Sequence, residues 1–369
     1  MDKTVSRRSF LAGCAGSALA LDLLPAQDPT TRKRELAWTD VGGWRIEGRA
    51  FAERTAPFDR LPAAAAAVVR KEVWDLSRHS AGMAVRFRTA ARELHVRYRL
   101  TKDTLAMPHM PATGVSGVDL YSRPKPGAPL RWVEVARPTQ RDVEARLAQN
   151  PEGSAREWLL YLPLYNGVEK LELGTPPGSE LTPHAPPSGQ PIVVYGTSIA
   201  HGACASRPGM AWPAIVGRKL EREVVNLGFS GNGRMEAEVG RFLCELDPAV
   251  FVVDCLPNMT PALVAERTQP LVRQLRGARP KTPILLVEDR TFGNAWIGAE
   301  RLAAHAKRRQ ALRDAFAALQ RDRVEAVHLL AGERLLGDDD EGTTDGSHPN
   351  DLGMMRQAEI VAATLQALL

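Results

Sequence analysis

The stretch Pro191-Ile192-Val193-Val194-Tyr195-Gly196-Thr197-Ser198 decides the fold of the C-terminal half of this chain. Its apolar run lacks polar alternation, which is typical of a parallel strand buried on both faces. Similar runs recur at residues 223–228, 249–255, 283–288 and 325–330. Helical patterns lie between them at residues 210–221, 234–246, 261–277 and 299–322, and a last one follows His348. Five such β-α units predict an open, doubly wound sheet with helices on both faces.

Residues that could take part in catalysis follow the ends of these predicted strands. Ser198 comes just past the first strand, Gly231 past the second and Asn258 past the third, while Asp345 and His348 follow the fifth. Ligands of open α/β sheets bind at the carboxyl ends of the strands. We therefore expect these segments to meet at one edge of the sheet.

Ser198, Asp345 and His348 are the residue types of a serine hydrolase. A serine hydroxyl is a poor nucleophile unless an imidazole takes its proton and a carboxylate holds that imidazole in the right tautomer. An aspartate and a histidine three residues apart are common by chance. The pair becomes a catalytic candidate because the predicted strands would bring Ser198 close to it.

Four sequence blocks resemble those of the SGNH (GDSL-type) hydrolases over residues 190–369. They are Tyr-Gly-Thr-Ser-Ile around Ser198, Asn-Leu-Gly-Phe-Ser-Gly-Asn-Gly around Gly231, Leu-Pro-Asn-Met around Asn258, and the pair Asp345 and His348. The resemblance implies a flavodoxin-like, three-layer α/β domain. It also implies that Ser198 is the nucleophile, His348 the general base and then acid, and Asp345 its orienting partner.

The same resemblance implies an oxyanion hole formed by the backbone N–H groups of Ser198 and Gly231 and the side-chain amide of Asn258. The alternative is that Gly231 is only a turn residue and Asn258 a loop cap. Two positions depart from the family pattern, because Thr197 and Met259 stand where the first and third blocks usually have aspartate. Neither position belongs to the triad, so the departures change the hydrogen bonding beside the serine without excluding activity.

The N-terminal half alternates apolar and polar residues, as half-buried antiparallel strands do. Residues 83–88 and 94–100 show this period, and residues 158–161 and 168–173 continue it around Asn166-Gly167, which predicts a hairpin. We therefore expect a β-sandwich over residues 35–185. A Pro/Gly-rich connector over residues 174–189 separates it from the hydrolase domain over residues 190–369.

Gly117-Val118-Asp119-Leu120-Tyr121 resembles the GxDLY motif that names the N-terminal domain of a subset of SGNH hydrolases. Asp119 is a candidate substrate-binding residue if it reaches the catalytic mouth, but a structural role as a turn cap is favoured. His109, in the loop Met107-Pro108-His109-Met110, is a second candidate for lining the pocket, although a lone loop histidine is more often a surface residue.

The charge pattern limits the partners of this chain. Arg86, Arg88, His95, Arg97 and Arg99 are predicted to form a basic face on adjacent strands, which would attract an acidic polysaccharide or simply be solvated. We do not expect nucleic acid to bind, because no binding motif is present and the formal charge is only +5 over 369 residues. The proposed chemistry needs no cofactor or metal.

The N-terminus resembles a twin-arginine export signal, here assigned to residues 1–26. Ser6-Arg7-Arg8-Ser9-Phe10-Leu11 precedes an apolar region that is too short to span a membrane, with cleavage sites after Ala20 or Ala26. A lipobox ending at Cys14 is disfavoured, because almost no apolar region precedes it. These features predict a periplasmic or extracellular protein without a transmembrane segment.

The sequence as a whole predicts an exported serine esterase that acts on O-acyl, and above all O-acetyl, esters of carbohydrates or other small esters. A lipase or thioesterase of the same fold is one alternative. A glycan-binding protein that has lost activity is the other. Cys204, close to Ser198 in the sequence, lacks the strand-end placement of a nucleophile.

Overall fold

The computed structural model describes residues 35–369. The predicted export signal, with Cys14 and both cleavage sites, lies outside the described residues. Within the described part of the chain, no helix is long and apolar enough to cross a membrane.

A parallel five-stranded sheet forms the C-terminal half, as predicted. Its strands are β11 (Ile192–Gly196), β12 (Val224–Gly228), β13 (Val250–Asp254), β14 (Ile284–Val287) and β15 (Val327–Leu330). They run in the order β12-β11-β13-β14-β15, which is the flavodoxin-like order. The chain reverses its direction of sheet growth between β11 and β13, and such a switch point is where open α/β sheets bind ligands.

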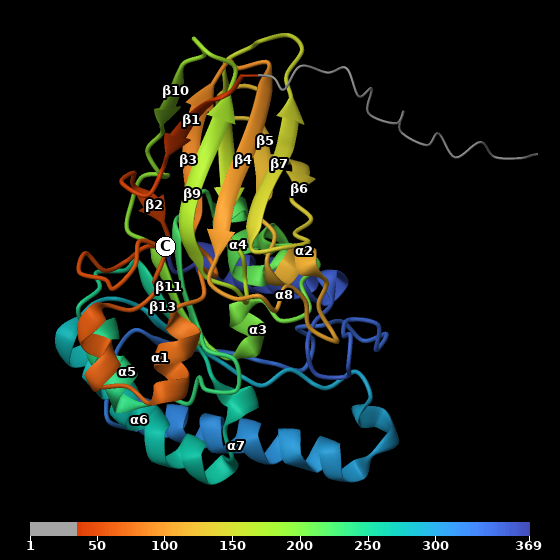
Figure 1. The fold of residues 1–369 in the computed structure, drawn as a ribbon. Coiled ribbons are helices and arrows are strands. Elements are labelled where there is room, and N and C mark those ends of the chain that lie inside the picture. Colours follow the sequence, from red (N-terminus) through yellow and green to blue (C-terminus); the bar gives the residue numbers. More distant parts are fainter. Residues whose placement is uncertain (1–34) are drawn as a thin grey trace, which may run out of the picture. The chain divides into compact units, whose positions relative to one another are not determined.

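Helices cover both faces of this sheet (Figure 1). Val193 and Tyr195 of β11 pack in one core with α5 (Ala237–Leu243), α6 (Pro261–Ala278) and α7 (Ala299–Arg321). Ile192 and Val194 pack in the other with α3 (Ser198–His201), α4 (Trp212–Leu220) and α8 (Asp351–Gln366). Alternate residues of one strand thus enter two cores, which explains why the strands show continuous apolar runs. Short 3-10 helices are η2 (Pro208–Met210), η3 (Leu256–Asn258) and η4 (Ala295–Ile297).

Two antiparallel sheets form the N-terminal β-sandwich. One sheet has the order β1 (Ala37–Asp40), β9 (Val168–Thr175), β4 (Glu93–Leu100) and β7 (Asp142–Gln149). The other has the order β10 (Leu181–Pro183), β3 (Ala84–Thr89), β8 (Arg156–Tyr161), β5 (Asp119–Arg123) and β6 (Arg131–Val135), with β2 (Ile46–Glu47) paired to β3. Alternate apolar residues of β3, β4, β8 and β9 share the core between the sheets.

The predicted hairpin at Asn166-Gly167 is wrong. β8 pairs with β3 and β5, whereas β9 pairs with β1 and β4, so residues 162–167 cross from one sheet to the other. The reason is a long-range contact: the fully buried Asn166 side chain accepts from the Thr101 hydroxyl (3.1 Å) and the Lys102 backbone N–H (3.0 Å). Asn166 therefore connects its own loop to the loop at Thr101 and Lys102, and Asn166-Gly167 does not form a two-residue hairpin turn.

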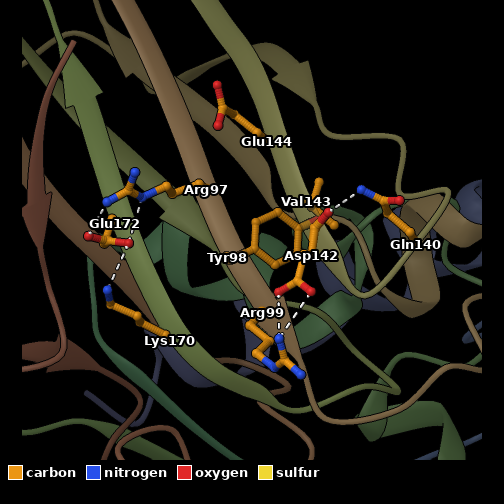
Figure 2. A pocket seen from close by; sticks show the side chains of 9 residues that line it. All are labelled: Arg97, Tyr98, Arg99, Gln140, Asp142, Val143, Glu144, Lys170 and Glu172. Atoms are coloured by element: carbon orange, nitrogen blue, oxygen red, sulfur yellow. Dashed lines mark hydrogen bonds and ion pairs between the residues drawn. The ribbon is translucent and has the colours of Figure 1, made fainter.

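The predicted basic face is also wrong, because β3 and β4 belong to different sheets. Arg86 of β3 is buried between Glu47 and Glu157. Figure 2 shows the face of β4, β7 and β9, which is hollowed by a groove of about 590 Å³. There Arg97 donates to Glu172 (2.6 and 2.8 Å) and Arg99 to Asp142 (3.0 Å). These pairs balance the charge of the groove, so it lacks the excess of positive charge that would attract an acidic polymer.

One N-terminal segment joins the core of the α/β sheet. It includes η1 (Ala63–Ala67) and α1 (Lys71–Ser77), and its apolar residues pack in the same cluster as β12 and α5. Arg60, which is 1% exposed, donates from this segment to the backbone carbonyls of Asn226 (3.1 Å) and Gly228 (2.7 Å) in β12. A short helix, α2 (Ala112–Val115), lies between β4 and β5 in the sequence. Residues 36–369 accordingly form one compact unit.

Candidate active site

Ser198 opens helix α3 directly after strand β11. Its Oγ lies 2.9 Å from Nε2 of His348, and Nδ1 of His348 lies 2.7 Å from Oδ2 of Asp345. The structure thus brings together the three predicted triad residues, although 150 positions separate Ser198 from His348. The arrangement can pass a proton from the hydroxyl to the imidazole.

The Asp345 carboxylate is held by its own loop. Oδ1 accepts from the backbone N–H groups of His348 (2.8 Å) and Ser347 (3.0 Å). Partial burial opposes ionisation, but these bonds and the His348 side chain outweigh it and lower the pKa of Asp345 to about 2. An ionised carboxylate at Nδ1 favours the tautomer with the proton on Nδ1, which leaves Nε2 free to accept from Ser198.

The helix that carries Ser198 is pressed closely against strand β12. A Cβ atom at Gly228 would lie 2.2 Å from the backbone nitrogen of His201, so any other residue would push α3 away. Thr197 caps the helix, because its Oγ1 accepts from the Ile199 N–H (3.3 Å). Threonine therefore supplies the cap acceptor at the position where the family usually has aspartate, and Met259, the other departure, is buried in the core.

The three predicted oxyanion donors follow three adjacent strands of the sheet. Ser198 is the first residue of α3, so its backbone N–H has no partner within the helix. Gly231 has φ +70°, a conformation that strongly favours glycine, and the space where a Cβ would lie is open. The Asn258 amide satisfies its neighbours when its oxygen accepts from the N–H groups of Asn232 (3.0 Å) and Gly233 (3.2 Å), which directs its NH₂ group away from them.

The sandwich half contributes His109 to the site. The rings of His109 and His348 stack with their centroids 5.7 Å apart. The loop that carries His109 is closed by two hydrogen bonds between the backbones of Met107 and Met110, each 3.0 Å long. His109 therefore lies directly beside the histidine of the candidate triad.

Asp119 lies elsewhere. Its carboxylate is fully buried and accepts from Trp132 Nε1 (2.9 Å), Arg207 (2.8 Å) and the Gly209 N–H (2.8 Å). Burial raises its pKa, and Arg207 partly offsets this effect. The motif aspartate therefore joins β5 to the segment that contains η2, and this placement favours a structural role over substrate contact.

Sequence reasoning missed a buried polar cluster behind the nucleophile. Tyr165 stacks on His201 at 4.2 Å and donates from its hydroxyl to the Ser198 carbonyl at 3.4 Å. His79 Nδ1 lies 3.3 Å from His201 Nε2, which also lies 2.7 Å from the Leu164 carbonyl. Burial, reinforced by nearby Lys102 and Arg60, holds the pKa of both histidines well below the ordinary value. His201 follows Ser198 at helical spacing, a usable signal, whereas nothing in the sequence links His79 or Tyr165 to it.

Cys204 lies close to the Asp345–His348 pair. Its sulfur, one carboxylate oxygen of Asp345 and one ring nitrogen of His348 all lie within 4.8 Å of one another. Burial raises the pKa of the Cys204 thiol to about 11. The thiol is therefore protonated at neutral pH, which makes it a poor nucleophile.

Comparison with known proteins agrees with this fold. Residues 36–181 match the model of the N-terminus of SGNH-hydrolase-type esterases, and residues 189–366 match that of the GDSL-like lipase/acylhydrolase family. A protein from Bacteroides ovatus described as a GDSL-like lipase shares 31% identity, with 90% of this chain and 98% of that one covered and a TM-score of 0.86. No curated protein matches the sequence.

Two more distant solved structures share the fold. A salicylyl-acyltransferase from a tetracycline biosynthetic pathway has 20% identity and a TM-score of 0.72, with 91% of this chain and 98% of that one covered. An acetyl xylan esterase from Butyrivibrio proteoclasticus has 12% identity and a TM-score of 0.55, with 90% and 98% covered. This chain belongs to the GDSL-like lipase/acylhydrolase family with the SGNH fold, and it is an acyl-ester hydrolase.

Proposed function

We propose that this protein is an exported serine esterase that removes small O-acyl groups, principally acetyl, from carbohydrates. The observation that carries the proposal is the continuous link from Ser198 Oγ through His348 to the Asp345 carboxylate. Each link is within hydrogen-bond reach, as a nucleophile, its base and the group that orients the base require.

In the acylation step, His348 Nε2 takes the proton of Ser198 while Oγ attacks the ester carbonyl carbon. The negative charge that develops on the carbonyl oxygen is stabilised by the N–H groups of Ser198 and Gly231 and by the Asn258 amide. The imidazolium then gives its proton to the sugar oxygen as the ester C–O bond breaks, which leaves an acyl-enzyme.

In the deacylation step, water takes the place of the sugar hydroxyl. His348 accepts a proton from the water, whose oxygen attacks the acyl carbon. The imidazolium returns the proton to Ser198 Oγ as the acid leaves. Asp345 stays ionised throughout and stabilises the imidazolium of both steps.

Two observations support a carbohydrate substrate. The Asp345 and His348 side chains are 39% and 26% exposed, so the site is open enough for a bulky, polar alcohol. Solved structures with the same fold include an acetyl xylan esterase and a family two carbohydrate esterase from Clostridium thermocellum in complex with cellohexaose. Export, proposed from the N-terminal sequence, would give the enzyme access to such polymers.

The test compares esters that differ in acyl chain length and in the alcohol that carries the acyl group. Purified protein is assayed on 4-nitrophenyl acetate and octanoate, and acetate release from acetylated xylan is measured in parallel. The proposal predicts faster cleavage of acetate than octanoate and release of acetate from the polymer. Preference for octanoate would point to the lipase alternative, and hydrolysis of neither ester would favour the glycan-binding alternative.

A further inference from the structure

Cys204, Asp345 and His348 lie close together and offer three kinds of metal ligand: a thiol, a carboxylate and an imidazole. Cys204 has φ +67°, a left-handed conformation that costs a residue with a Cβ roughly 1–2 kcal/mol. This strained residue lies between Ser198 and helix η2 in the sequence. Its thiol also forms a hydrogen bond with the side chain of Thr344, the residue before Asp345. The thiol is therefore fixed beside the Asp345–His348 pair.

The donor set suits Zn²⁺ in particular. Thiolate, imidazole and carboxylate are the three ligand types of zinc sites, and three protein ligands with an open fourth position are a common zinc arrangement. Zn–N and Zn–O bonds of about 2.0–2.1 Å and Zn–S bonds of about 2.3 Å place ligand atoms roughly 3.3–3.8 Å apart. The three atoms here lie within 4.8 Å of one another, so a shift of about 1 Å would bring even the widest possible pair to zinc-ligand spacing.

We infer that Zn²⁺ binds to Cys204, Asp345 and His348 and thereby inhibits the esterase. The inhibitory part rests on the proposed function, because it depends on the catalytic use of His348. Both ring nitrogens are committed to catalysis: Nε2 to Ser198 and Nδ1 to Asp345. A metal on either nitrogen therefore breaks one of the two links.

Binding is measured first, by calorimetric titration of ZnCl₂ into the purified protein. We expect one site that weakens about 100-fold or more in Cys204→Ala, since a lost ligand costs at least as much as a lost outer partner. Cys244→Ala is the matched control, because Cys244 is a half-buried free cysteine on the other face of the sheet and should leave the site unchanged. MgCl₂ should not bind there, since Mg²⁺ does not favour thiolate.

Cys204→Gly guards against a folding effect, because glycine adopts φ +67° without strain. It should lose the zinc site while keeping or raising the melting temperature. Unchanged zinc affinity in both Cys204→Ala and Cys204→Gly would overturn the inference.

Inhibition is measured as the ratio of esterase rates with and without ZnCl₂ for each protein. Wild type and Cys244→Ala should be inhibited, and a chelator should restore their activity, whereas Cys204→Ala should be inhibited only at about 100-fold higher zinc. Equal inhibition of all three would overturn the inference while leaving the esterase in place. Titration of Ser198→Ala, which keeps all three ligands, tests the site independently of activity: a retained site supports the inference even if no ester is hydrolysed.

Discussion

At the scale of single residues, the site depends on one imidazole held between two short hydrogen bonds. Asp345 accepts from Nδ1 of His348 at 2.7 Å and from two backbone N–H groups of its own loop. The carboxylate therefore fixes both the loop and the tautomer. A substitution that removes the charge of Asp345 but keeps its shape should separate its effect on the loop from its effect on the His348 tautomer.

Asp345→Asn should lower kcat by about 10³–10⁴-fold, because the amide can still accept from the loop backbone but no longer favours a proton on Nδ1. The check is the steady-state rate on 4-nitrophenyl acetate, together with the melting temperature. A rate within about tenfold of wild type in a folded protein would exclude Asp345 as the orienting group.

Asn258→Ala should lower kcat by about 100-fold or more through the loss of one oxyanion donor, with little change in KM. Asn258→Asp is the informative companion, because it keeps the acceptor for the Asn232 and Gly233 N–H groups and lacks the NH₂ donor. Both variants should lose rate. If Asn258→Asp kept wild-type activity, the residue would be only a loop cap.

The sequence names both His109 and Asp119 as candidate substrate-binding residues, and the two should differ sharply in experiment. His109→Ala removes the ring stacked on His348, so kcat/KM should fall by about tenfold at unchanged melting temperature. Asp119→Asn weakens three buried hydrogen bonds and should instead lower the free energy of unfolding by about 2 kcal/mol or more. The reverse pattern in the two variants would show that the roles are exchanged.

At the scale of elements, helix α3 rests on the buried rings of His201, Tyr165 and His79. The pKa of both histidines lies well below the unfolded value of about 6.5. The unfolded chain therefore binds more protons than the folded one once the pH falls below about 6.5, and stability is lost in that direction.

Urea unfolding should consequently give a lower free energy at about pH 5 than near neutral pH. His79→Gln should reduce this pH dependence, because one of the two groups that resist protonation is gone. The same loss of stability with acidification in wild type and His79→Gln would assign the effect to other groups.

Most elements of the α/β half could be predicted from the sequence, because strands buried on both faces leave uninterrupted apolar runs. β11, β12, β13, β14 and β15 fall within the predicted runs, and Ser198, Asp345 and His348 meet as the strand ends required. The sandwich was harder. Period-two patterns predict β3 and β4 as strands, but the local sequence does not show which sheet each strand joins. The predicted hairpin and the predicted basic face are wrong for this reason.

At the scale of the whole molecule, the two halves share buried polar contacts that no local pattern reveals. Arg60 donates to carbonyls of β12, and Asp119 of β5 binds Arg207 beside η2. The cluster behind Ser198 likewise takes His79 and Tyr165 from the N-terminal half. These contacts join residues far apart in the chain, which is why the sequence predicts the candidate triad but not the buried residues that support it.

Arg60→Met should lower the free energy of unfolding by about 3 kcal/mol or more, because it leaves several buried carbonyls without a donor. Residues 36–369 should unfold in a single calorimetric transition. Two separate transitions, or a stable fragment comprising residues 189–369, would show that the shared contacts contribute little.

We propose above all that Ser198 is the nucleophile of an esterase. This role is tested most directly by the hydrolysis of 4-nitrophenyl acetate by the wild-type protein and by Ser198→Ala, purified side by side and checked for equal melting temperature. We predict rapid turnover by the wild type and a loss of about 10³-fold or more in the variant. Equal rates in the two proteins, or no turnover by either, would show that Ser198 does not have this role.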